Sequence, residues 1–507
     1  MTRATSGVPA ASGGINGRLK RTGIDIAPVF GRLSPPDRMN IKFGTDGWRA
    51  VIAEEFTFQN VERVAQATAE YWKDQPVTGT NPLVIVGYDR RFLSDRFARR
   101  TAEVLAGNGL AVVLSNCAAP TPSISYAVKQ RKAVGGVMIT ASHNPAIFNG
   151  FKLKAHYGGS AESALCQEVE KRIDLQPVRK ASGPSEKIQL EDLRPPHFQA
   201  IKRLVDFKLI AKSKLRFAHD ALFGVGAGCF EVLLRGTTCQ VTTLNGEHDS
   251  NFGGINPEPI ALNYGKSSAF LKKHPHDFCL VTDGDADRIG GMDRRGRPLT
   301  THQIICLLLH HFIVNRKAKG RVIKALTTTS MVDKICAHYG MELVETGVGF
   351  KYICAEMLKG NVMLGFEESG GIGFPELMPE RDGIAAGMIL LELLATEKLP
   401  VNTLLRRLEK QFGPHRYARV DTHFPLERRA DLMEYCKAHP PAKLDGSPLA
   451  EIKSSAGVKY VARDGSWLML RGSGTEPVLR IYAEAKSDSA AQKLLQDGQR
   501  LTRKVVP

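Results

Sequence analysis

An apolar run that stops abruptly in small and polar residues constrains this sequence more than any other feature. Residues 134–139 are apolar apart from two glycines and predict a buried strand, and Thr140-Ala141-Ser142-His143-Asn144-Pro145 follows at once. In open α/β sheets, ligands bind beyond the carboxyl ends of the strands. We therefore expect Ser142 and His143 at a ligand site, with a chain turn at Asn144-Pro145. Taken alone, the same residues also fit an ordinary loop.

Strand, helix and strand alternate along most of the chain, which indicates an α/β fold. Residues 83–89 predict a buried strand, residues 97–106 a helix and residues 112–114 a further strand. This alternation is typical of parallel βαβ units. Two more blocks follow, with strands expected at 215–218, 239–244, 278–281, 322–326 and 362–365, and helices at 224–234, 304–314, 331–339 and 384–395.

The chain is too long, at 507 residues, for a single core. After about residue 413, short alternating segments and one amphipathic stretch predict an antiparallel sheet with a closing helix. We expect an α/β protein with three tandem α/β domains with mixed sheets, plus a C-terminal α+β domain. The expected parts are a flexible N-terminal tail at 1–38 and domains at 39–190, 191–298, 299–412 and 413–507.

Charge and composition indicate which kinds of molecule this protein can bind and in which compartment it can work. Lys and Arg number 69 against 52 Asp and Glu, a net charge of +17, which suggests anionic partners such as phosphorylated metabolites. The basic residues are scattered and not interleaved with aromatic residues, which argues against nucleic acid. Apolar runs are too short for a membrane helix, which requires about 18 residues. Nine irregularly spaced cysteines without Cys-x-x-Cys argue against a disulfide framework and a zinc site, and favour a cytoplasmic location.

A second polar loop follows the strand expected at 278–281. In Asp283-Gly284-Asp285-Ala286-Asp287-Arg288, three carboxylates alternate with small residues. They converge on one point only if a cation holds them, and a divalent cation with oxygen ligands is the natural choice. An EF-hand loop is excluded because its required Gly and Glu positions hold Arg288 and Arg294. The alternative is a solvated acidic turn.

Two further loops are weaker signals. Gly365-Phe366-Glu367-Glu368-Ser369-Gly370-Gly371 ends another strand and suits recognition of sugar hydroxyls. Gly347 lies in a loop that could line a ligand, and Lys351 could do the same. Arg471-Gly472-Ser473-Gly474-Thr475-Glu476-Pro477, with Arg480 beyond it, offers donors for a phosphate dianion. An ordinary turn explains this last stretch equally well.

These four loops, in this order and on three α/β blocks plus one α+β block, resemble the α-D-phosphohexomutase family. That family includes phosphoglucomutases, phosphomannomutases and phosphoglucosamine mutases, and the resemblance runs from about Ile41 to the end. It implies four domains around a central cleft. The implied roles are a phosphorylated serine at Ser142; metal ligation by Ser142, Asp283, Asp285 and Asp287; a reaction centre lined by Arg49, His143, Lys152 and Arg288; reading of sugar hydroxyls by Glu367 and Ser369; and phosphate binding by Arg471, Ser473, Gly474 and Thr475.

The resemblance also implies the cofactors and the reaction. Mg²⁺ would neutralise charge as phosphoryl moves between Ser142 and a hexose phosphate, with hexose 1,6-bisphosphate as intermediate and activator. Many relatives carry Lys where this chain has Arg381, and an arginine is a poor general base. Lys152 or His143 is therefore the better candidate for proton transfer. Glu368 stands where the glucosamine branch usually has Gln, which favours glucose or mannose phosphate, with glucose first.

Two other functions compete with the mutase. A serine phosphatase would hydrolyse phospho-Ser142 and would leave the remote Arg471 loop without a purpose. A non-enzymatic basic scaffold would bind anions and give Ser142 no chemistry. The preferred expectation is a monomer or homodimer acting on a small phosphosugar, with no nucleic acid or membrane partner.

Overall fold

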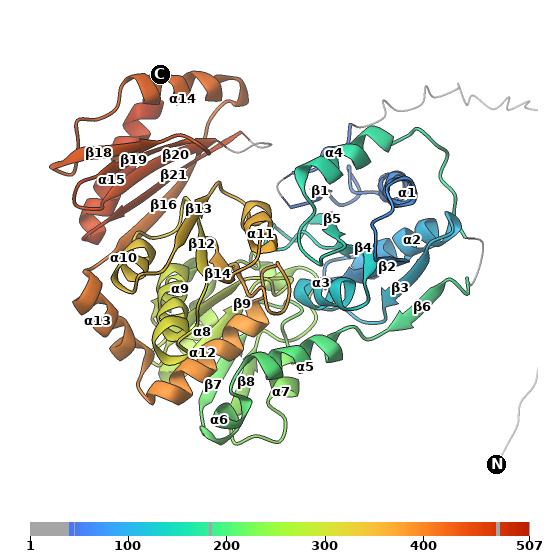
Figure 1. The fold of residues 1–507 in the computed structure, drawn as a ribbon, viewed down its shortest axis with the longest axis horizontal. Coiled ribbons are helices and arrows are strands. Elements are labelled where there is room, and N and C mark those ends of the chain that lie inside the picture. The colour runs from blue at the N-terminus through green and yellow to red at the C-terminus, as the bar shows by residue number, and fades with distance from the viewer. Residues whose placement is uncertain (1–39, 45, 182–184, 473–476, 506–507) are drawn as a thin grey trace, which may run out of the picture. The chain divides into compact units, whose positions relative to one another are not determined.

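The computed structural model describes residues 40–44, 46–181, 185–472 and 477–505. These residues form four sheets, each with its own helices (Figure 1). Three sheets are mixed and the last is antiparallel. The predicted fold class, three α/β domains and a C-terminal α+β domain, is confirmed. The predicted tail at 1–38 lies outside the described residues.

The first sheet has the strand order β1-β5-β4-β2-β3-β6. β2, β3, β4 and β6 are parallel, as the alternation predicts, whereas β5 runs antiparallel to β4 and to β1. The elements are β1 (Trp48–Val51), α1 (Phe58–Asp74), β2 (Asn81–Tyr88), α2 (Ser94–Gly107), β3 (Ala111–Ser115), α3 (Thr121–Gln130), β4 (Ala133–Ile139), β5 (Phe148–Ala155), α4 (Ser163–Arg172) and β6 (Ile188–Glu191).

Sequence reasoning missed β5 because its pattern is not apolar. Lys152 and Lys154 both lie in this strand and are buried, with side chains paired to carboxylates. Buried charges of this kind are rare unless they are paired. The buried face of β5 therefore carries paired cations where a strand in an ordinary core would carry valine or leucine.

The second sheet has the order β11-β10-β9-β7-β8. Its elements are α5 (Arg194–Leu204), α6 (Phe207–Lys212), β7 (Arg216–Asp220), α7 (Cys229–Leu233), β8 (Gln240–Leu244), η1 (Phe252–Gly254), η2 (Ala261–Asn263), α8 (Gly265–Lys273), β9 (Phe278–Thr282), β10 (Ile289–Asp293) and β11 (Pro298–Leu299). The helix expected at 224–234 is shorter in the structure, where α7 begins only at Cys229. Gly224 instead packs on the backbone of Asp283 and Gly284, where a Cβ would lie 2.8 Å from each carbonyl oxygen.

The third sheet has the order β13-β12-β14-β15. Its elements are α9 (Thr301–His310), η3 (His311–Asn315), β12 (Arg321–Ala325), α10 (Met331–His338), β13 (Leu343–Thr346), α11 (Phe350–Leu358), β14 (Val362–Phe366), β15 (Ile372–Gly373), α12 (Gly383–Glu397) and α13 (Val401–Phe412). The helix expected at 304–314 begins earlier, because Thr300 and Gln303 form a capping box, and it continues as a π-helical turn.

The fourth sheet is antiparallel in the order β16-β21-β20-β19-β18-β17. Its elements are β16 (Arg416–His423), η4 (Leu426–Arg428), α14 (Arg429–Ala438), β17 (Lys443–Leu444), β18 (Ser447–Lys453), β19 (Val458–Ala462), β20 (Trp467–Gly472), β21 (Val478–Ala485) and α15 (Asp488–Thr502). α15 is the predicted closing helix, and Ser487 caps its first turn.

One helix joins the second and third blocks. Residues 383–395 of α12 are all buried, because the helix packs against α9 of its own block and against α6, β9 and β10 of the second block. Apart from Glu392 these residues are apolar or glycine, and a helix that is apolar on nearly all sides must be enclosed in this way. The largest apolar core of the protein accordingly runs through both blocks without interruption.

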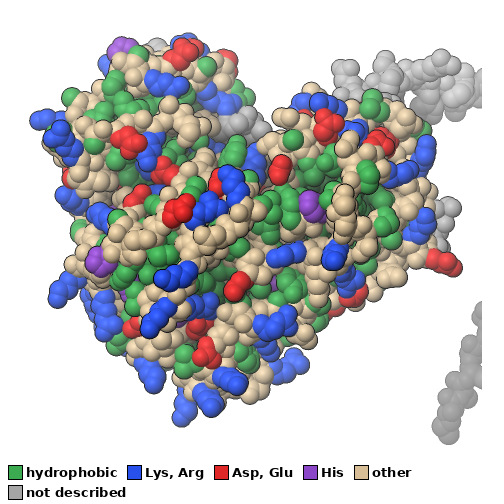
Figure 2. Space-filling model, viewed as in Figure 1, with side chains coloured by type: hydrophobic (Ala, Val, Ile, Leu, Met, Phe, Trp, Pro, Cys, Tyr) green, Lys and Arg blue, Asp and Glu red, His purple; other side chains and the backbone are tan. Residues whose placement is uncertain are grey.

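The basic side chains are scattered over the surface in view, and the cysteines are not paired with one another. Lys and Arg side chains are spread over the face shown in Figure 2 and do not gather into one patch. All nine cysteines are free, and seven are buried. Within the described ranges, no helix has the length and apolar character that crossing a membrane requires.

Candidate active site

The serine loop follows β4, a central strand of the first sheet. Ser142 is buried and has a left-handed backbone conformation, with φ of 53°. Its amide donates to Thr140 Oγ1 at 2.9 Å, and Thr140 Oγ1 in turn donates to Asp89 Oδ2 at 2.6 Å. The Ser142 hydroxyl donates to Asp283 Oδ2 at 3.0 Å. The loop therefore presents the hydroxyl to the second block.

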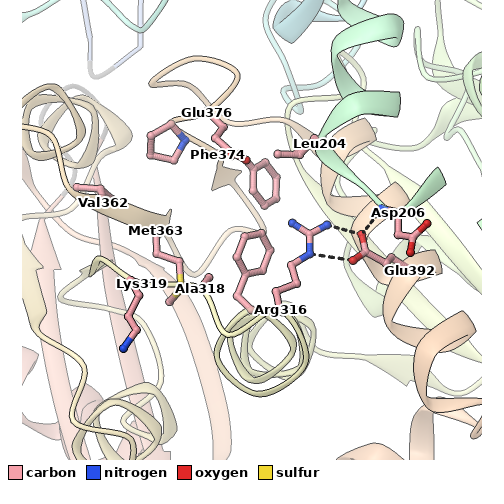
Figure 3. Close-up of a pocket in the computed structure, with 12 residues that line it drawn as sticks. Leu204, Asp206, Arg316, Ala318, Lys319, Val362, Met363, Phe374, Glu376 and Glu392 are labelled. Carbon is pink, nitrogen blue, oxygen red and sulfur yellow. Dashed lines mark hydrogen bonds and ion pairs between the residues drawn. The ribbon is translucent and has the colours of Figure 1, made fainter. Parts of the chain in front are cut away.

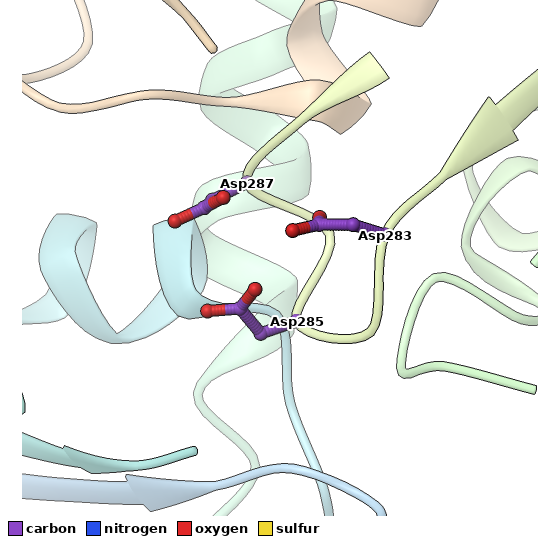
Figure 4. A group of neighbouring side chains, drawn as sticks. All are labelled: Asp283, Asp285 and Asp287. Carbon is purple, nitrogen blue, oxygen red and sulfur yellow. The ribbon is translucent and has the colours of Figure 1, made fainter. Parts of the chain in front are cut away.

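The acidic loop follows β9, the central strand of the second sheet. Asp283, Asp285 and Asp287 are fully buried, and one oxygen of each lies within 4.8 Å of the others. Their carboxylates converge from one tight loop, as Figure 4 shows. Gly284 is required here, because a Cβ would lie only 2.6 Å from the carbonyl oxygen of Ser142. The two loops are in direct backbone contact.

The acidic cluster fits a hard divalent cation. Among the described residues, neither Asp285 Oδ1 nor Asp287 Oδ1 has a hydrogen-bond partner. Burial raises the pKa of Asp283 well above its usual value, and the neighbouring charges of Asp285 and Asp287 add to this rise. A cation would satisfy the vacant oxygens and relieve the repulsion. A solvated acidic turn is incompatible with complete burial.

Lysine and arginine side chains surround the carboxylates. Lys152 Nζ lies 2.9 Å from Asp285 Oδ2, 2.9 Å from Asp46 Oδ2 and 3.4 Å from Asp287 Oδ2. Arg288 Nε lies 3.8 Å from Asp287 Oδ1 and 3.9 Å from Asp283 Oδ2. The cations of the predicted reaction centre are thus paired with carboxylates of the protein itself.

Arg49 and His143 lie at the serine loop and near the arginine of the acidic loop. Arg49 donates to Asn144 Oδ1 at 2.7 Å, so that it is attached to the serine loop. His143 Nδ1 is buried and has no hydrogen-bond partner among the described residues. Burial, Arg288 and Arg49 hold the pKa of His143 well below its ordinary value, so the imidazole is neutral at pH 7.

Arg381 joins the loops of three blocks. Its guanidinium lies 2.7 Å from Asp46 Oδ2, 2.9 Å from Asp287 Oδ2 and 3.1 Å from Glu367 Oε1. Glu367 also accepts a hydrogen bond from Ser369 Oγ at 2.8 Å. Burial disfavours the charge of Arg381, but the carboxylates of Asp287, Asp46, Glu367 and Glu380 outweigh it and raise the pKa of Arg381.

The remaining predicted residues that the structure describes make contacts away from the acidic loop. Gly347 and Arg471 line one cavity of about 530 Å³, together with Tyr352 and Arg429. Lys351 is directed elsewhere and donates to Ser163 Oγ at 2.8 Å. Arg480 Nε lies 3.5 Å from Asp421 Oδ2. Ser473, Gly474 and Thr475 lie outside the described residues.

Sequence reasoning missed several polar residues of this centre. Asp46 binds Lys152 and Arg381, and Thr121 Oγ1 donates to Asp285 Oδ2 at 2.7 Å. Arg91, three residues beyond the end of β2, binds main-chain carbonyls of the serine loop. Asp89 directly follows the apolar strand β2 and so carried the same kind of signal as the serine loop, whereas Asp46 follows no such strand.

A separate cavity of about 410 Å³ has a different character. Arg316 and Glu392 face one another within it, as the dashed lines in Figure 3 show, with Arg316 Nε donating to Glu392 Oε1 at 2.9 Å. Asp206 and Glu376 also line it, whereas the predicted site residues do not. This cavity therefore has no part in the site predicted from the sequence.

Comparisons with known proteins agree with this geometry. Successive parts of the chain match the phosphoglucomutase/phosphomannomutase alpha/beta/alpha domains I, II and III and the C-terminal domain, at residues 40–177, 195–296, 300–412 and 428–498. The chain belongs to the phosphoglucomutase/phosphomannomutase family. It is therefore an enzyme of the phosphohexomutase class, and the resemblance described above is confirmed.

Individual members of the family are similar over nearly their whole length. A phosphoglucomutase/phosphomannomutase of Thermococcus kodakarensis is 30% identical over 462 residues, covering 90% of this chain and 98% of that protein. A phosphoglucosamine/phosphogalactosamine mutase of Sulfurisphaera tokodaii is 30% identical over 466 residues, covering 90% and 97%. The crystal structure of a candidate phosphomannomutase from Thermus thermophilus has a TM-score of 0.81 and 35% identity, covering 92% of this chain and 99% of that one.

Proposed function

We propose that this phosphohexomutase interconverts the 1- and 6-phosphates of glucose, with Ser142 carrying the phosphoryl group between half-reactions. The observation that carries the proposal is the 3.0 Å contact between Ser142 Oγ and Asp283 Oδ2. It brings the hydroxyl of one block to three buried carboxylates of another. Such a pair suits phosphoryl transfer, in which charge on the transferring group must be neutralised.

Mg²⁺ is the proposed metal. Asp283, Asp285 and Asp287 would hold it together with the phosphorylated Ser142, and their donor set of carboxylate oxygens fits this ion. When bound, the ion supplies charge neutralisation at the transferring phosphoryl group. Lys152, Arg288 and Arg49 would add positive charge around the same group. Phosphoserine itself brings about −1.5 to −2 charges.

The proton of the attacking sugar hydroxyl also needs an acceptor. Arg381 is unsuitable, because its surrounding carboxylates keep it protonated. Burial lowers the pKa of Lys152, but Asp285, Asp46 and Asp287 reverse this effect and raise it. His143 is neutral, and its Nδ1 has no hydrogen-bond partner among the described residues. It is therefore the better candidate for the proton acceptor.

The cycle has two half-reactions. Phospho-Ser142 gives its phosphoryl group to the free hydroxyl of a hexose monophosphate: the serine O–P bond breaks and a sugar O–P bond forms. The hydroxyl proton passes to the base, and the released Ser142 oxygen takes up one proton in exchange, which restores the serine hydroxyl. The hexose 1,6-bisphosphate then turns over and returns its other phosphoryl group to Ser142. Added hexose 1,6-bisphosphate would activate the protein by phosphorylating Ser142.

Sugar and phosphate recognition would come from the third and fourth blocks. Glu367 and Ser369 would read sugar hydroxyls, and Gly347, Lys351 and Arg381 would line the substrate. Arg471, Arg480, Ser473, Gly474 and Thr475 would hold the phosphate that does not react. Glu368 favours glucose or mannose phosphate over glucosamine phosphate, with glucose first. The domain boundaries, the cytoplasmic location and a monomeric or dimeric state remain predictions.

Glucosamine phosphate is a further candidate substrate, because a relative that is also 30% identical, over 466 residues, is a phosphoglucosamine/phosphogalactosamine mutase. A coupled assay with Mg²⁺ and a trace of glucose 1,6-bisphosphate ranks the sugars, with glucose, mannose and glucosamine 1-phosphates given in turn. We expect 6-phosphate without free phosphate, fastest from glucose. Faster conversion of another sugar would overturn the assignment to glucose, and free phosphate would overturn the mutase mechanism.

A further inference from the structure

The loop that carries Ser142 closes around a buried arginine. Arg91 directs its two terminal nitrogens at main-chain carbonyls of the segment that joins β4 to β5 and of the first residue of β5. The four acceptors are the carbonyl oxygens of Ser142 at 2.7 Å, Asn144 at 2.7 Å, Pro145 at 2.8 Å and Phe148 at 3.0 Å. The Arg91 side chain has no solvent-exposed surface. One guanidinium thus binds both ends of the loop and its middle.

The arginine is itself fixed from two sides. Arg91 Nε lies 3.3 Å from Asp89 Oδ2, and Asp89 also accepts hydrogen bonds from Thr140 Oγ1 and from Ser94 Oγ at 2.8 Å. The ring of Phe252, from the second block, lies 4.9 Å from the guanidinium carbon. A carboxylate and an aromatic face therefore enclose the cation.

This support acts on a strained residue. A non-glycine residue with a φ of 53°, as Ser142 has, persists only where its surroundings fix it. Here the Ser142 amide is bound by Thr140 and its carbonyl by Arg91. A lysine has three donors on one atom and cannot reproduce the planar fork that reaches four carbonyls.

We propose that Arg91 is a positioning residue that fixes the Ser142 loop for phosphoryl transfer. The inference rests on the proposed function, in which Ser142 carries the phosphoryl group. Within the described residues, Arg91 makes no hydrogen bond to the acidic cluster, and it acts through the loop backbone. Its loss would affect the chemical step, because a displacement of about 1 Å at a reacting atom can cost about a hundredfold in rate.

Single-turnover kinetics test this role. The full-length protein is phosphorylated on Ser142 with glucose 1,6-bisphosphate, and transfer to glucose 1-phosphate is timed by rapid quench. We expect Arg91→Lys to slow transfer by about tenfold and Arg91→Met by about a hundredfold, with KM changed less than about twofold. Arg90→Lys is the matched control. Arg90 is the neighbour of Arg91 in the chain, but its side chain donates to the carbonyl oxygen of Gly246 in the second block and not to the serine loop.

A spectroscopic measurement separates positioning from simple destabilisation. The ³¹P resonance of phospho-Ser142 should move in the Arg91 variants toward that of phosphoserine in an unfolded peptide, at a temperature where circular dichroism shows them folded. If both Arg91 variants fail to fold, Phe252→Leu, which removes only the enclosing ring, should still slow single-turnover transfer by several-fold.

The outcomes distinguish this inference from the mutase proposal. A wild-type protein that neither phosphorylates Ser142 nor converts any sugar phosphate would overturn both. The role of Arg91 alone would be overturned by a different result. In that case the wild-type protein is active, and those of Arg91→Lys, Arg91→Met and Phe252→Leu that fold keep the wild-type single-turnover rate and ³¹P shift. Slower transfer with KM retained would support it.

Discussion

Ser142 Oγ and Asp283 Oδ2 lie 3.0 Å apart although 141 residues separate them in the chain. Each residue lies just beyond the end of a central strand, β4 for the serine and β9 for the aspartate. The contact therefore joins the carboxyl edges of two different sheets. It places a hydroxyl that can carry phosphoryl at three carboxylates that can hold a cation, and the predictions below probe both partners.

Replacing Ser142 with alanine should abolish turnover and leave the fold intact. The hydroxyl is the proposed phosphoryl carrier, so we expect activity to fall at least about a thousandfold. The lost hydrogen bond to Asp283 should change stability by only about 1 kcal/mol. The coupled assay and thermal unfolding measure the two effects. Exposed Ser489→Ala is the control, and full activity in Ser142→Ala would disprove the phosphoserine mechanism.

Replacing Asp285 with asparagine should weaken metal binding and turnover together. The substitution removes one of three clustered carboxylates and the partner of Lys152 and Thr121. We expect the Mg²⁺ concentration for half-maximal activity to rise at least about tenfold, measured by titrating Mg²⁺ into the chelator-treated protein. Exposed Glu247→Gln should titrate like the wild type. An unchanged Mg²⁺ response in Asp285→Asn would place the metal elsewhere.

The strand ends were predictable because apolar runs that stop in polar residues have a clear pattern. The runs before Ser142, Asp283 and Glu367 were each recognised, and each is a strand in the structure. β5 and the short α7 were not predicted correctly. β5 buries Lys152 and Lys154, and Gly224, before α7, packs against the acidic loop. Local patterns fail where side chains or glycines serve a partner far along the chain.

Replacing Gly284 with alanine should move the serine loop. A Cβ at this position would lie 2.6 Å from the Ser142 carbonyl oxygen, a distance that requires the backbone to shift. We expect kcat to fall by about tenfold or more, measured at saturating substrate. Gly265→Ala is a matched control, since its Cβ would meet nothing within 4 Å. Equal activity of the two variants would show that the loop contact is not needed.

Replacing Arg381 with methionine should destabilise the protein. Asp46, Asp287 and Glu367 would lose their shared cation in a buried setting, which typically costs about 3–5 kcal/mol. Thermal unfolding without metal or sugar would measure the loss. Arg381→Lys keeps the charge and should recover part of the stability. A methionine variant that unfolds at the wild-type temperature would show that the carboxylates need no shared cation.

Glu392 should contribute stability that depends on pH. Burial disfavours its charge, but hydrogen bonds from His311 and Arg316 outweigh burial and lower the pKa of Glu392 to about 2. An unfolded glutamate has a pKa of about 4.3, so the contribution is full above about pH 4.3 and is lost as pH falls toward 2. It amounts to at most about 3 kcal/mol, because solvent near the cavity screens part of the interaction.

Urea unfolding of Glu392→Gln and the wild type at pH 6 and pH 3 measures this contribution. The difference in free energy of unfolding should be large at pH 6 and smaller at pH 3. Exposed Glu376→Gln, on the same cavity, is the control (Figure 3). A difference that is the same at both pH values would contradict the lowered pKa of Glu392.

The candidate site was only partly accessible from the sequence. Ser142 and the three aspartates stood out because each loop carries its chemistry within a few residues. Asp46 and Arg91 did not, because their roles arise from contacts with Arg381 and with loop carbonyls that no local pattern records. Such residues become visible only when the sheets are assembled.

The burial of α12 also determines how this protein can be divided. The helix belongs by sequence to the third block, yet it covers β9 and β10, and β9 leads directly into the acidic loop. A fragment ending near residue 298 would lose that cover and expose apolar surface beside the three aspartates. We therefore expect the two middle blocks to fold together, and recombination between relatives to be tolerated at their outer borders before the border they share.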